Sequence, residues 1–284
     1  MLYRKCLFVA LLFLLPLAVH AQSPEDALMN ELYVKSGMEK QVEQFPLIIQ
    51  AGFDQAVARD EHLQRLPQNI TADIRRLIKQ SFTEELFKKT MLEEVATEMS
   101  RADIKQVLQW LDSPLGKKCR QLEEAATTPE ILNEIQAYAI KMQESPPSKA
   151  RLRLVQEFDA VTQATEANVT ISMNTQFAVT AAIVATLPPE AQIPPDEIMG
   201  ELEKVRADLK AMLRPQVIMS ILYTYRTLSD DELERYIEFS KSRVGSKYQR
   251  VTISGFKKAL TDGAIRWGHS IGKLLQHTNK QSEA

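Results

Sequence analysis

The sequence predicts an all-α protein, on three observations. Apolar residues return at steps of three and four, as in Ile74, Leu77 and Ile78, which is the period of a helix with one buried face. Glycine is scarce, with 9 in 284 residues, whereas loop-rich and all-β proteins use more. The chain also has no convincing stretch of alternating apolar and polar residues and no Asn-Gly turn, so nothing in it indicates a β-hairpin.

The first residues have the pattern of an export signal. Arg4 and Lys5 precede an apolar run that ends near Ala18, and Val19-His20-Ala21 suits cleavage by signal peptidase. The run is short for a membrane span. We therefore expect a signal peptide at residues 1–21, cleavage after Ala21 and a protein located in the periplasm.

Cysteine usage indicates that the core alone holds the fold together. Cys6 falls in the expected signal peptide, so Cys119 is the single cysteine of the mature chain and an internal disulfide is impossible. Cys119 lies between Leu115 and Leu122 at helical spacing, which favours a buried, small apolar side chain.

The two halves of the chain resemble each other. At an offset of 129, Ser100 aligns with Ser229, and no gap is needed across the densest stretch of matches. The aligned pairs include Ile104 and Leu233, Trp110 and Phe239, Ser113 and Ser242, Gly116 and Gly245, and Lys118 and Lys247. Self-similarity of this kind indicates an internal repeat. With Pro146-Pro147 as the linker, we expect a tandem duplication of a helical domain at residues 22–145 and 146–284, with four to five helices each.

Each repeated segment reads as a helix, a sharp corner and a second helix. Ser100 with Asp103, and Ser229 with Glu232, fit the capping box that begins a helix. In the first copy Ser113-Pro114 then fits a second N-cap, with proline where its missing N–H costs nothing.

A glycine follows inside each second helix, and there it costs about 0.5–1 kcal/mol relative to alanine. We therefore expect close approach of a neighbouring helix at both corners. The residues assigned to this corner motif are Ser113, Pro114, Gly116, Lys118, Ser242, Gly245 and Lys247.

These corner residues resemble the signature of a bacterial exported domain-of-unknown-function family, family 2059, in which an aromatic residue precedes Ser-Pro-x-Gly and a lysine. The first copy reads Trp110 to Lys118, and the second reads Phe239 to Lys247, with Arg243 in place of the proline. The resemblance covers about twenty residues per copy. It implies an exported, helical, periplasmic domain in a Gram-negative bacterium. It implies no activity and supplies no catalytic residues.

The sequence carries little sign of metal, cofactor or nucleophile chemistry. His269 and His277 are eight residues apart, too far for the pairing of a zinc helix, and no cofactor or phosphate-loop motif occurs. Ser270 and Lys273 match Ser-x-x-Lys, but the companion motifs of the penicillin-binding enzymes are absent. Nucleic acid is not an expected partner of an exported chain with a net charge of −2.

Paired carboxylates leave one enzymatic alternative open, a cell-wall hydrolase with two acids in its cleft. The pairs are Glu84-Glu85, Glu93-Glu94 and Glu123-Glu124. Neighbouring residues on a helix point about 100° apart, so we interpret all three pairs as solvated charges.

The C-terminal stretch is basic and helical, with an aromatic residue nearby. It packs as the closing helix of the second repeat, or else it contacts an anionic membrane surface or an acidic partner. The candidate contact residues are Lys257, Lys258, Arg266, Trp267 and Lys273. Glycines at 263, 268 and 272 favour close packing.

The tyrosines of the second half fit either a helical core or a ligand cleft. They are Tyr223, Tyr225 and Tyr236, with Met212 and Met219 close in sequence. Together the patterns predict a non-catalytic binding or protein-interaction module whose partner is another envelope protein, a membrane surface or an apolar ligand. The main alternative is a carrier or chaperone that holds an apolar ligand between the two halves, since ligand sites favour interfaces.

Overall fold

The computed structural model describes residues 24–59, 61–126, 131–184, 187 and 189–282. Every regular element in this part of the chain is a helix, which confirms the all-α prediction. Within the same residues, no helix combines the length and the apolar character that crossing a membrane requires. The expected signal peptide at residues 1–21 lies outside the described residues.

Eight helices precede the predicted boundary at residue 145 in the described chain. They are α1 (Pro24–Lys35), α2 (Met38–Arg59), α3 (Glu61–Gln64), α4 (Gln68–Ser81), α5 (Glu84–Glu98), α6 (Arg101–Asp112), α7 (Pro114–Ala125) and α8 (Ile131–Glu144). Pro146-Pro147 separates α8 from the next helix, as expected of a helix-breaking pair.

The described part of the second half holds six α-helices and a short 3-10 turn. They are α9 (Lys149–Thr162), α10 (Ala164–Val184), η1 (Pro189–Ala191), α11 (Pro195–Lys204), α12 (Arg206–Thr224), α13 (Asp230–Lys241) and α14 (Arg243–Ser282). Each half therefore has more helices than the four or five predicted.

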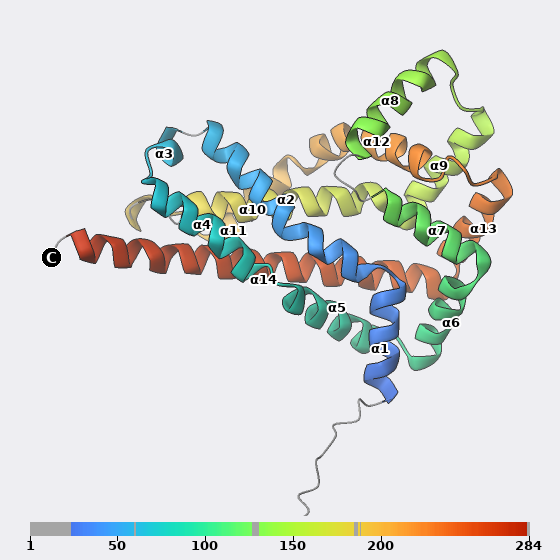
Figure 1. Ribbon diagram of the computed structural model, residues 1–284, viewed down its shortest axis with the longest axis horizontal. Helices are drawn as coiled ribbons and strands as arrows, with labels where there is room; N and C mark the ends of the chain where they lie inside the picture. The colour runs from blue at the N-terminus through green and yellow to red at the C-terminus, as the bar shows by residue number, and fades with distance from the viewer. Residues whose placement is uncertain (1–23, 60, 127–130, 185–186, 188, 283–284) are drawn as a thin grey trace, which may run out of the picture.

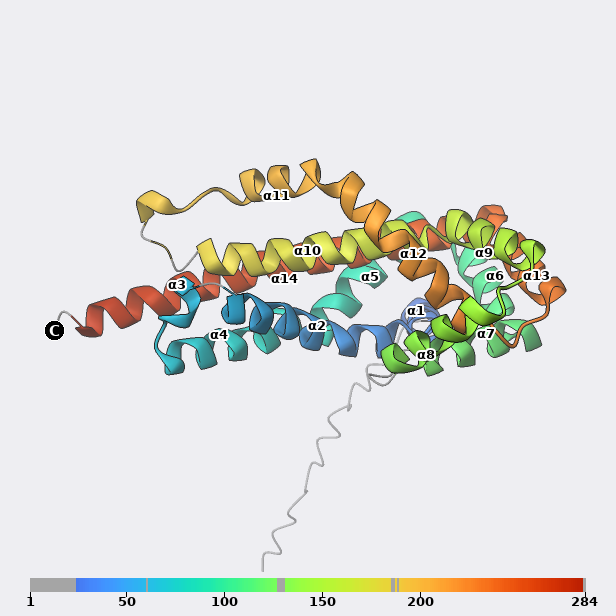
Figure 2. The same cartoon turned by 90° about the horizontal axis from the view of Figure 1, so that it is seen from above.

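Helix α14 is the central helix of the molecule, along which other helices pack. It has 40 residues and runs from the end of the molecule that holds α6, α7 and α13 to the opposite end, where the chain finishes (Figure 1). Helices α10, α5 and α4 pack along it. In the second view α10 and α14 again lie side by side, with α11 and the start of α12 outside them (Figure 2).

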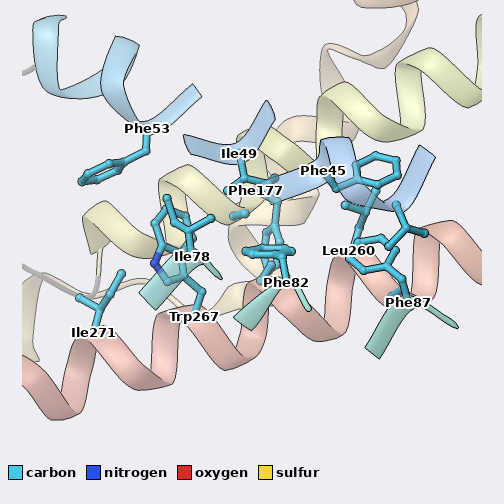
Figure 3. Close-up of a cluster of buried hydrophobic side chains, with 14 of the residues drawn as sticks. Phe45, Ile49, Phe53, Ile78, Phe82, Phe87, Phe177, Leu260, Trp267 and Ile271 are labelled. Atoms are coloured by element: carbon cyan, nitrogen blue, oxygen red, sulfur yellow. The ribbon is translucent and has the colours of Figure 1, made fainter. Parts of the chain in front are cut away.

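The main core surrounds the middle and distal parts of α14. Trp267 lies there with no exposed area, and its ring meets those of Phe53 and Phe82 edge to face, at centroid distances of 5.6 and 6.2 Å. Its indole N–H donates to the carbonyl of Ile74 at 3.1 Å. Figure 3 shows this cluster between α14 and the helices of the first half.

The predicted halves share their cores. The main cluster combines Phe45 and Ile74 with Phe177 and Trp267, from opposite sides of residue 145. A second cluster joins Cys119 of α7 to side chains of α9, α12 and α13. A third joins Val107 of α6 to the first turns of α14. The duplicated sequence pattern thus maps onto one continuous packed structure.

Candidate functional site

The two helical corners have the same local geometry. Ser100 and Ser229 both form complete capping boxes, with Asp103 and Glu232 as the reciprocal acids. At the first corner the Ser113 hydroxyl donates to the carbonyl of Trp110 at 2.6 Å and accepts from the amide of Gly116 at 3.0 Å.

Ser242 repeats both bonds of the first corner at the same distances, with the carbonyl of Phe239 and the amide of Gly245. At each corner, one serine therefore forms a hydrogen bond to the helix before it and another to the helix after it.

Both corner glycines face a backbone carbonyl of the preceding helix. A Cβ atom on Gly116 would lie 2.1 Å from the Trp110 oxygen, and one on Gly245 would lie 2.0 Å from the Phe239 oxygen. A side chain there has no room unless the backbone moves. The close approach expected from the sequence is therefore present, and it involves the helix that immediately precedes each corner.

The two corners contact each other reciprocally. Lys118 of α7 binds Glu232, the capping acid of α13, at 2.7 Å, and Lys247 of α14 lies 3.4 Å from Asp103, the capping acid of α6. Arg243, which replaces the proline in the second copy, also binds Asp103 at 2.6 Å. The hydrogen bond and charge of Arg243, followed by the hydrogen bonds of Ser100, hold the pKa of the Asp103 carboxyl well below its usual range.

The two aromatic residues of the motif also meet. The rings of Trp110 and Phe239, which align in the sequence, stack at 4.4 Å with an interplanar angle of 8°. Capping acids, lysines and aromatic rings from both copies therefore lie together at one end of the molecule.

The basic C-terminal residues do not form one surface with the nearby tryptophan. Lys257, Lys258, Arg266 and Lys273 are exposed on α14, but Trp267 is fully buried. The expectation of a surface contact is therefore wrong for Trp267, because the helix turns this residue towards α2 and α4.

The three glycines of this stretch behave differently from one another. A Cβ on Gly263 would meet the ring of Phe82 at 2.5 Å, whereas nothing lies within 4 Å of one on Gly268 or Gly272. Only Gly263 therefore shows the close packing that the glycines led us to expect.

A cavity of about 280 Å³ lies beside the paired corners. Helices from both halves line it, and it is partly open to solvent. Its wall includes Trp110, Cys119, Arg120, Glu123, Phe158, Thr162, Ala164, Ala167, Tyr225, Tyr236, Tyr248, Gln249 and Thr252. The volume is close to the lower end of the range for small-molecule sites.

Glu123 is the one acidic residue among those that line the cavity. The hydroxyl groups of Tyr225 and Tyr236 both donate to its Oε1, at 2.7 and 2.8 Å. Burial raises the pKa of the Glu123 carboxyl, and the two tyrosine hydrogen bonds and the charge of Arg120 offset part of that effect. The same arrangement raises the pKa of both tyrosines, mainly through their own burial.

Aromatic rings surround the carboxylate. Phe158 lies 5.0 Å from the ring centres of both Tyr225 and Tyr236, tilted by 65° and 69°. Trp110 lies 5.5 Å from Tyr236. Tyr248 of α14 lines the same cavity. Tilted and edge-to-face pairs of this kind stabilise the packing of the rings, so the aromatic side chains around Glu123 pack on one another.

Two further polar side chains line the cavity, and they differ in whether their polar atoms have hydrogen-bond partners. Arg120 donates to the backbone carbonyl of Ser36 at 2.5 Å and lies 3.9 Å from Glu124. The buried Oε1 atom of Gln249 has no hydrogen-bond partner. Arg120 and Gln249 align with each other at the offset of 129 found in the sequence.

Cys119 is buried as the sequence predicts, with 2% of its surface exposed. Burial, together with the charge of Glu123, raises the pKa of its thiol to about 12. A thiol in this state is a poor nucleophile at neutral pH, and its role is to pack α7 against the second half.

We predict that Glu123→Gln changes how stability depends on pH. The pKa of Glu123 is raised in the folded state above its ordinary value of 4.5. Between these two pKa values the folded protein therefore binds more protons than the unfolded chain. The free energy of unfolding falls as the pH rises through this range. Urea unfolding from pH 4 to 8 should show the wild type losing stability relative to the variant from near pH 4.5 upwards. A difference that is constant, or that moves in favour of the wild type as pH rises, would contradict the raised pKa.

The interpretation of all glutamate pairs as solvated charges is wrong for Glu123. The sequence did indicate that Glu123 lies on a buried face, because it is four residues after Cys119 and therefore on the same side of the helix. Glu84, Glu85 and Glu93 are exposed, and Glu94 lies 3.6 Å from Lys258. Arg120 and Gln249 carried no signal that marked them as cavity residues.

The tyrosines of the second half divide between the cavity and the protein interior. Tyr225 and Tyr236 line the cavity, while Tyr223 donates to Glu134 and lies against the guanidinium of Arg226 at 3.9 Å. Met212 is exposed. Of the predicted cleft residues, two therefore contribute to a site.

Within the described residues, no group of three histidine, cysteine, aspartate or glutamate side chains is placed to hold a metal ion. The side chains of His62 and His277 lie outside that description. No protein family, curated protein or solved structure matches the chain. The resemblance to family 2059 therefore stays a prediction, and the cavity is the strongest guide to function.

Proposed function

We propose that this protein is a non-catalytic binding protein that holds a small ligand in the cavity between its two halves. The observation that carries the proposal is the cavity itself, of about 280 Å³, with an aromatic wall and the partly buried carboxyl of Glu123. A concave site with few convergent polar groups is the usual form of a ligand pocket.

We further propose that the two halves are a duplicated unit, which would explain why the site lies between them. The helix bounds support this, since most helices of the first half have a counterpart about 120–130 residues later. The counterparts are α1 and α9, α2 and α10, α4 and α11, α5 and α12, and α6 and α13. By the same alignment, α14 corresponds to α7 and α8 joined into one helix.

The packing of the helices supports the same relation. Helix α1 packs on α6 as α9 packs on α13, and α2 packs on α5 as α10 packs on α12. The last helices are exchanged, because α14 packs on α5 of the first half while α7 and α8 pack on α12 of the second. The lysine and acid pairs at the corners follow the same exchange. Helices of both halves line the cavity beside the corners.

The proposal includes export to the periplasm, which rests on the sequence of residues 1–21 and on the corner motif shared with family 2059. The polar groups of the cavity wall favour a ligand that is partly polar over the purely apolar ligand of the carrier hypothesis. The hydrolase alternative needs two carboxyl groups about 5–10 Å apart, and Glu123 is the single carboxylate among the lining residues.

Filling the cavity tests the proposal. Ala167 of α10 lines the cavity, so Ala167→Leu should occupy part of the space and exclude a ligand. Ala160 on the neighbouring helix α9 is exposed, so Ala160→Leu is the matched control. We expect native mass spectrometry of the protein, purified without denaturation from its own cells, to show an added non-covalent mass on the wild type and on Ala160→Leu. Ala167→Leu should lack that mass while retaining helical circular dichroism.

Two results would contradict the proposal. One is a bare chain mass for the wild type and for Ala160→Leu. The other is an added mass that Ala167→Leu retains, because the ligand would then lie elsewhere on the molecule.

A further inference from the structure

The charges of the cavity wall are not balanced around Glu123. Both tyrosine hydrogen bonds go to Oε1, and neither tyrosine carries a positive charge. Among the described residues, no lysine or arginine forms an ion pair with Glu123 and no donor is within hydrogen-bond distance of its Oε2. A buried carboxylate usually has a cation against it, so this one has spare capacity for a positive group.

The one cationic side chain in the wall is already engaged. The Arg120 guanidinium donates to the Ser36 carbonyl at 2.5 Å and lies 3.9 Å from a carboxylate oxygen of Glu124. These contacts hold Arg120 against the junction of α1 and α2. Arg120 lowers the pKa of Glu123 through its charge, but this effect is smaller than that of burial.

The other polar residues of the wall include the amides of Gln41 and Gln249 and the hydroxyl of Tyr248. The buried Gln249 Oε1 atom has no donor, and the hydroxyl of Thr252 is turned to the backbone carbonyl of Tyr248 at 2.9 Å. A ligand with an N–H group would supply the donor that the Glu123 Oε2 atom lacks. A ligand with a carboxylate or phosphate would place its charge beside Glu123.

The aromatic wall favours the same kind of ligand. Trp110, Phe158, Tyr225, Tyr236 and Tyr248 line the cavity, and aromatic rings attract organic cations as well as apolar groups. The volume of about 280 Å³ equals that of about nine water molecules in the liquid. One ring with a short chain fits that space.

From these observations we propose that the cavity binds a small organic ammonium ion, an amine with an apolar or aromatic body, whose charged group pairs with Glu123. This assignment rests on the proposed function, because it requires that the cavity is a ligand site. It goes further by naming the ligand class and the residue that selects it.

Three probes of nearly equal size test the assignment, because they differ in charge. They are 2-phenylethylamine, 2-phenylethanol and phenylacetate, which are positive, neutral and negative at neutral pH. Isothermal titration calorimetry of the full chain should show the amine binding at least about tenfold more tightly than the alcohol, as expected of a charge-assisted hydrogen bond in a partly buried site. Phenylacetate should bind most weakly.

Two variants connect the preference to Glu123. Glu123→Gln keeps the shape and removes the charge, so the amine should lose about tenfold in affinity while the alcohol is unchanged. Glu238→Gln makes the same change on an exposed site of α13 outside the cavity, and it should leave both affinities unchanged. If Glu123→Gln does not fold, displacement of the alcohol by the amine on the wild type decides the preference.

The outcomes separate the two proposals. Equal binding of amine and alcohol, or preferred binding of phenylacetate, overturns the ammonium assignment. If Ala167→Leu then abolishes the binding of these probes, the ligand cavity itself is still supported. The ammonium assignment is also overturned if none of the three probes binds while the protein purified from its own cells carries a non-covalent added mass. If no probe binds and no mass is present, both proposals fail.

Discussion

Trp267→Ala should destabilise the protein by about 3–5 kcal/mol, the usual cost of deleting a large buried aromatic side chain. Trp267 is fully buried on α14, contacts Phe53 and Phe82, and donates to the carbonyl of Ile74. The substitution leaves a cavity between α14 and two segments of the first half, α2 and the end of α4. It also removes the hydrogen bond from the indole N–H to the Ile74 carbonyl, which adds to the cost.

Urea unfolding of the variant measures this effect, with Ile265→Ala as the control. Ile265 lies two residues earlier on the same helix and is 44% exposed, so its replacement should change stability by less than about 0.5 kcal/mol. Equal losses in the two variants would mean that α14 does not pack on the first half through Trp267.

Alanine at either corner glycine should destabilise by about 1–3 kcal/mol, as expected of overpacking. The Cβ atom added to Gly116 or Gly245 would lie about 2 Å from a carbonyl oxygen, and that oxygen belongs to the backbone, which cannot turn aside as a side chain can. The corner must open to relieve the contact. Opening it weakens the serine hydrogen bonds that join the two helices.

Gly268→Ala is the matched control for the corner variants. Gly268 also lies inside a helix, but nothing is within 4 Å of its added Cβ. Alanine should therefore stabilise the protein there by about 0.5–1 kcal/mol, through its better helix propensity. Thermal unfolding should shift in opposite directions for the two classes of variant. A shift in the same direction would contradict the need for glycine at the corners.

The local features of the fold were predictable because their signals lie within a few residues of each other. The capping boxes at Ser100 and Ser229 and the serine corners at Ser113 and Ser242 depend on side chains that bond to backbone groups three residues away. The corner glycines are recognisable for the same reason, because the carbonyl that excludes a Cβ atom is six residues earlier.

The contacts between distant segments were not predictable from these signals. A helical period shows that a residue lies on an apolar face but does not identify the helix that covers it. The sequence therefore left both a packed position and a surface contact open for Trp267. Its partners Phe53 and Ile74 are about 200 residues away in the chain.

The cavity follows from tertiary packing in the same way. Glu123 lies on the helix face of Cys119, which suggests burial, but its tyrosine partners come from α13 and the end of α12. Only the assembled structure brings them together, and it also places Gln249 of α14 in the same wall. A single sequence with one acid on a buried face does not reveal these neighbours.

A crystal structure of the protein grown with 2-phenylethylamine would show whether the amine pairs with Glu123 inside the cavity. We predict electron density for the amine inside the cavity, with its nitrogen within hydrogen-bond distance of Glu123 and its ring against the aromatic wall of Trp110, Phe158 and Tyr236. A cavity that holds only ordered water at saturating amine, or one closed by movement of Tyr236 or Tyr248 into it, would contradict the account.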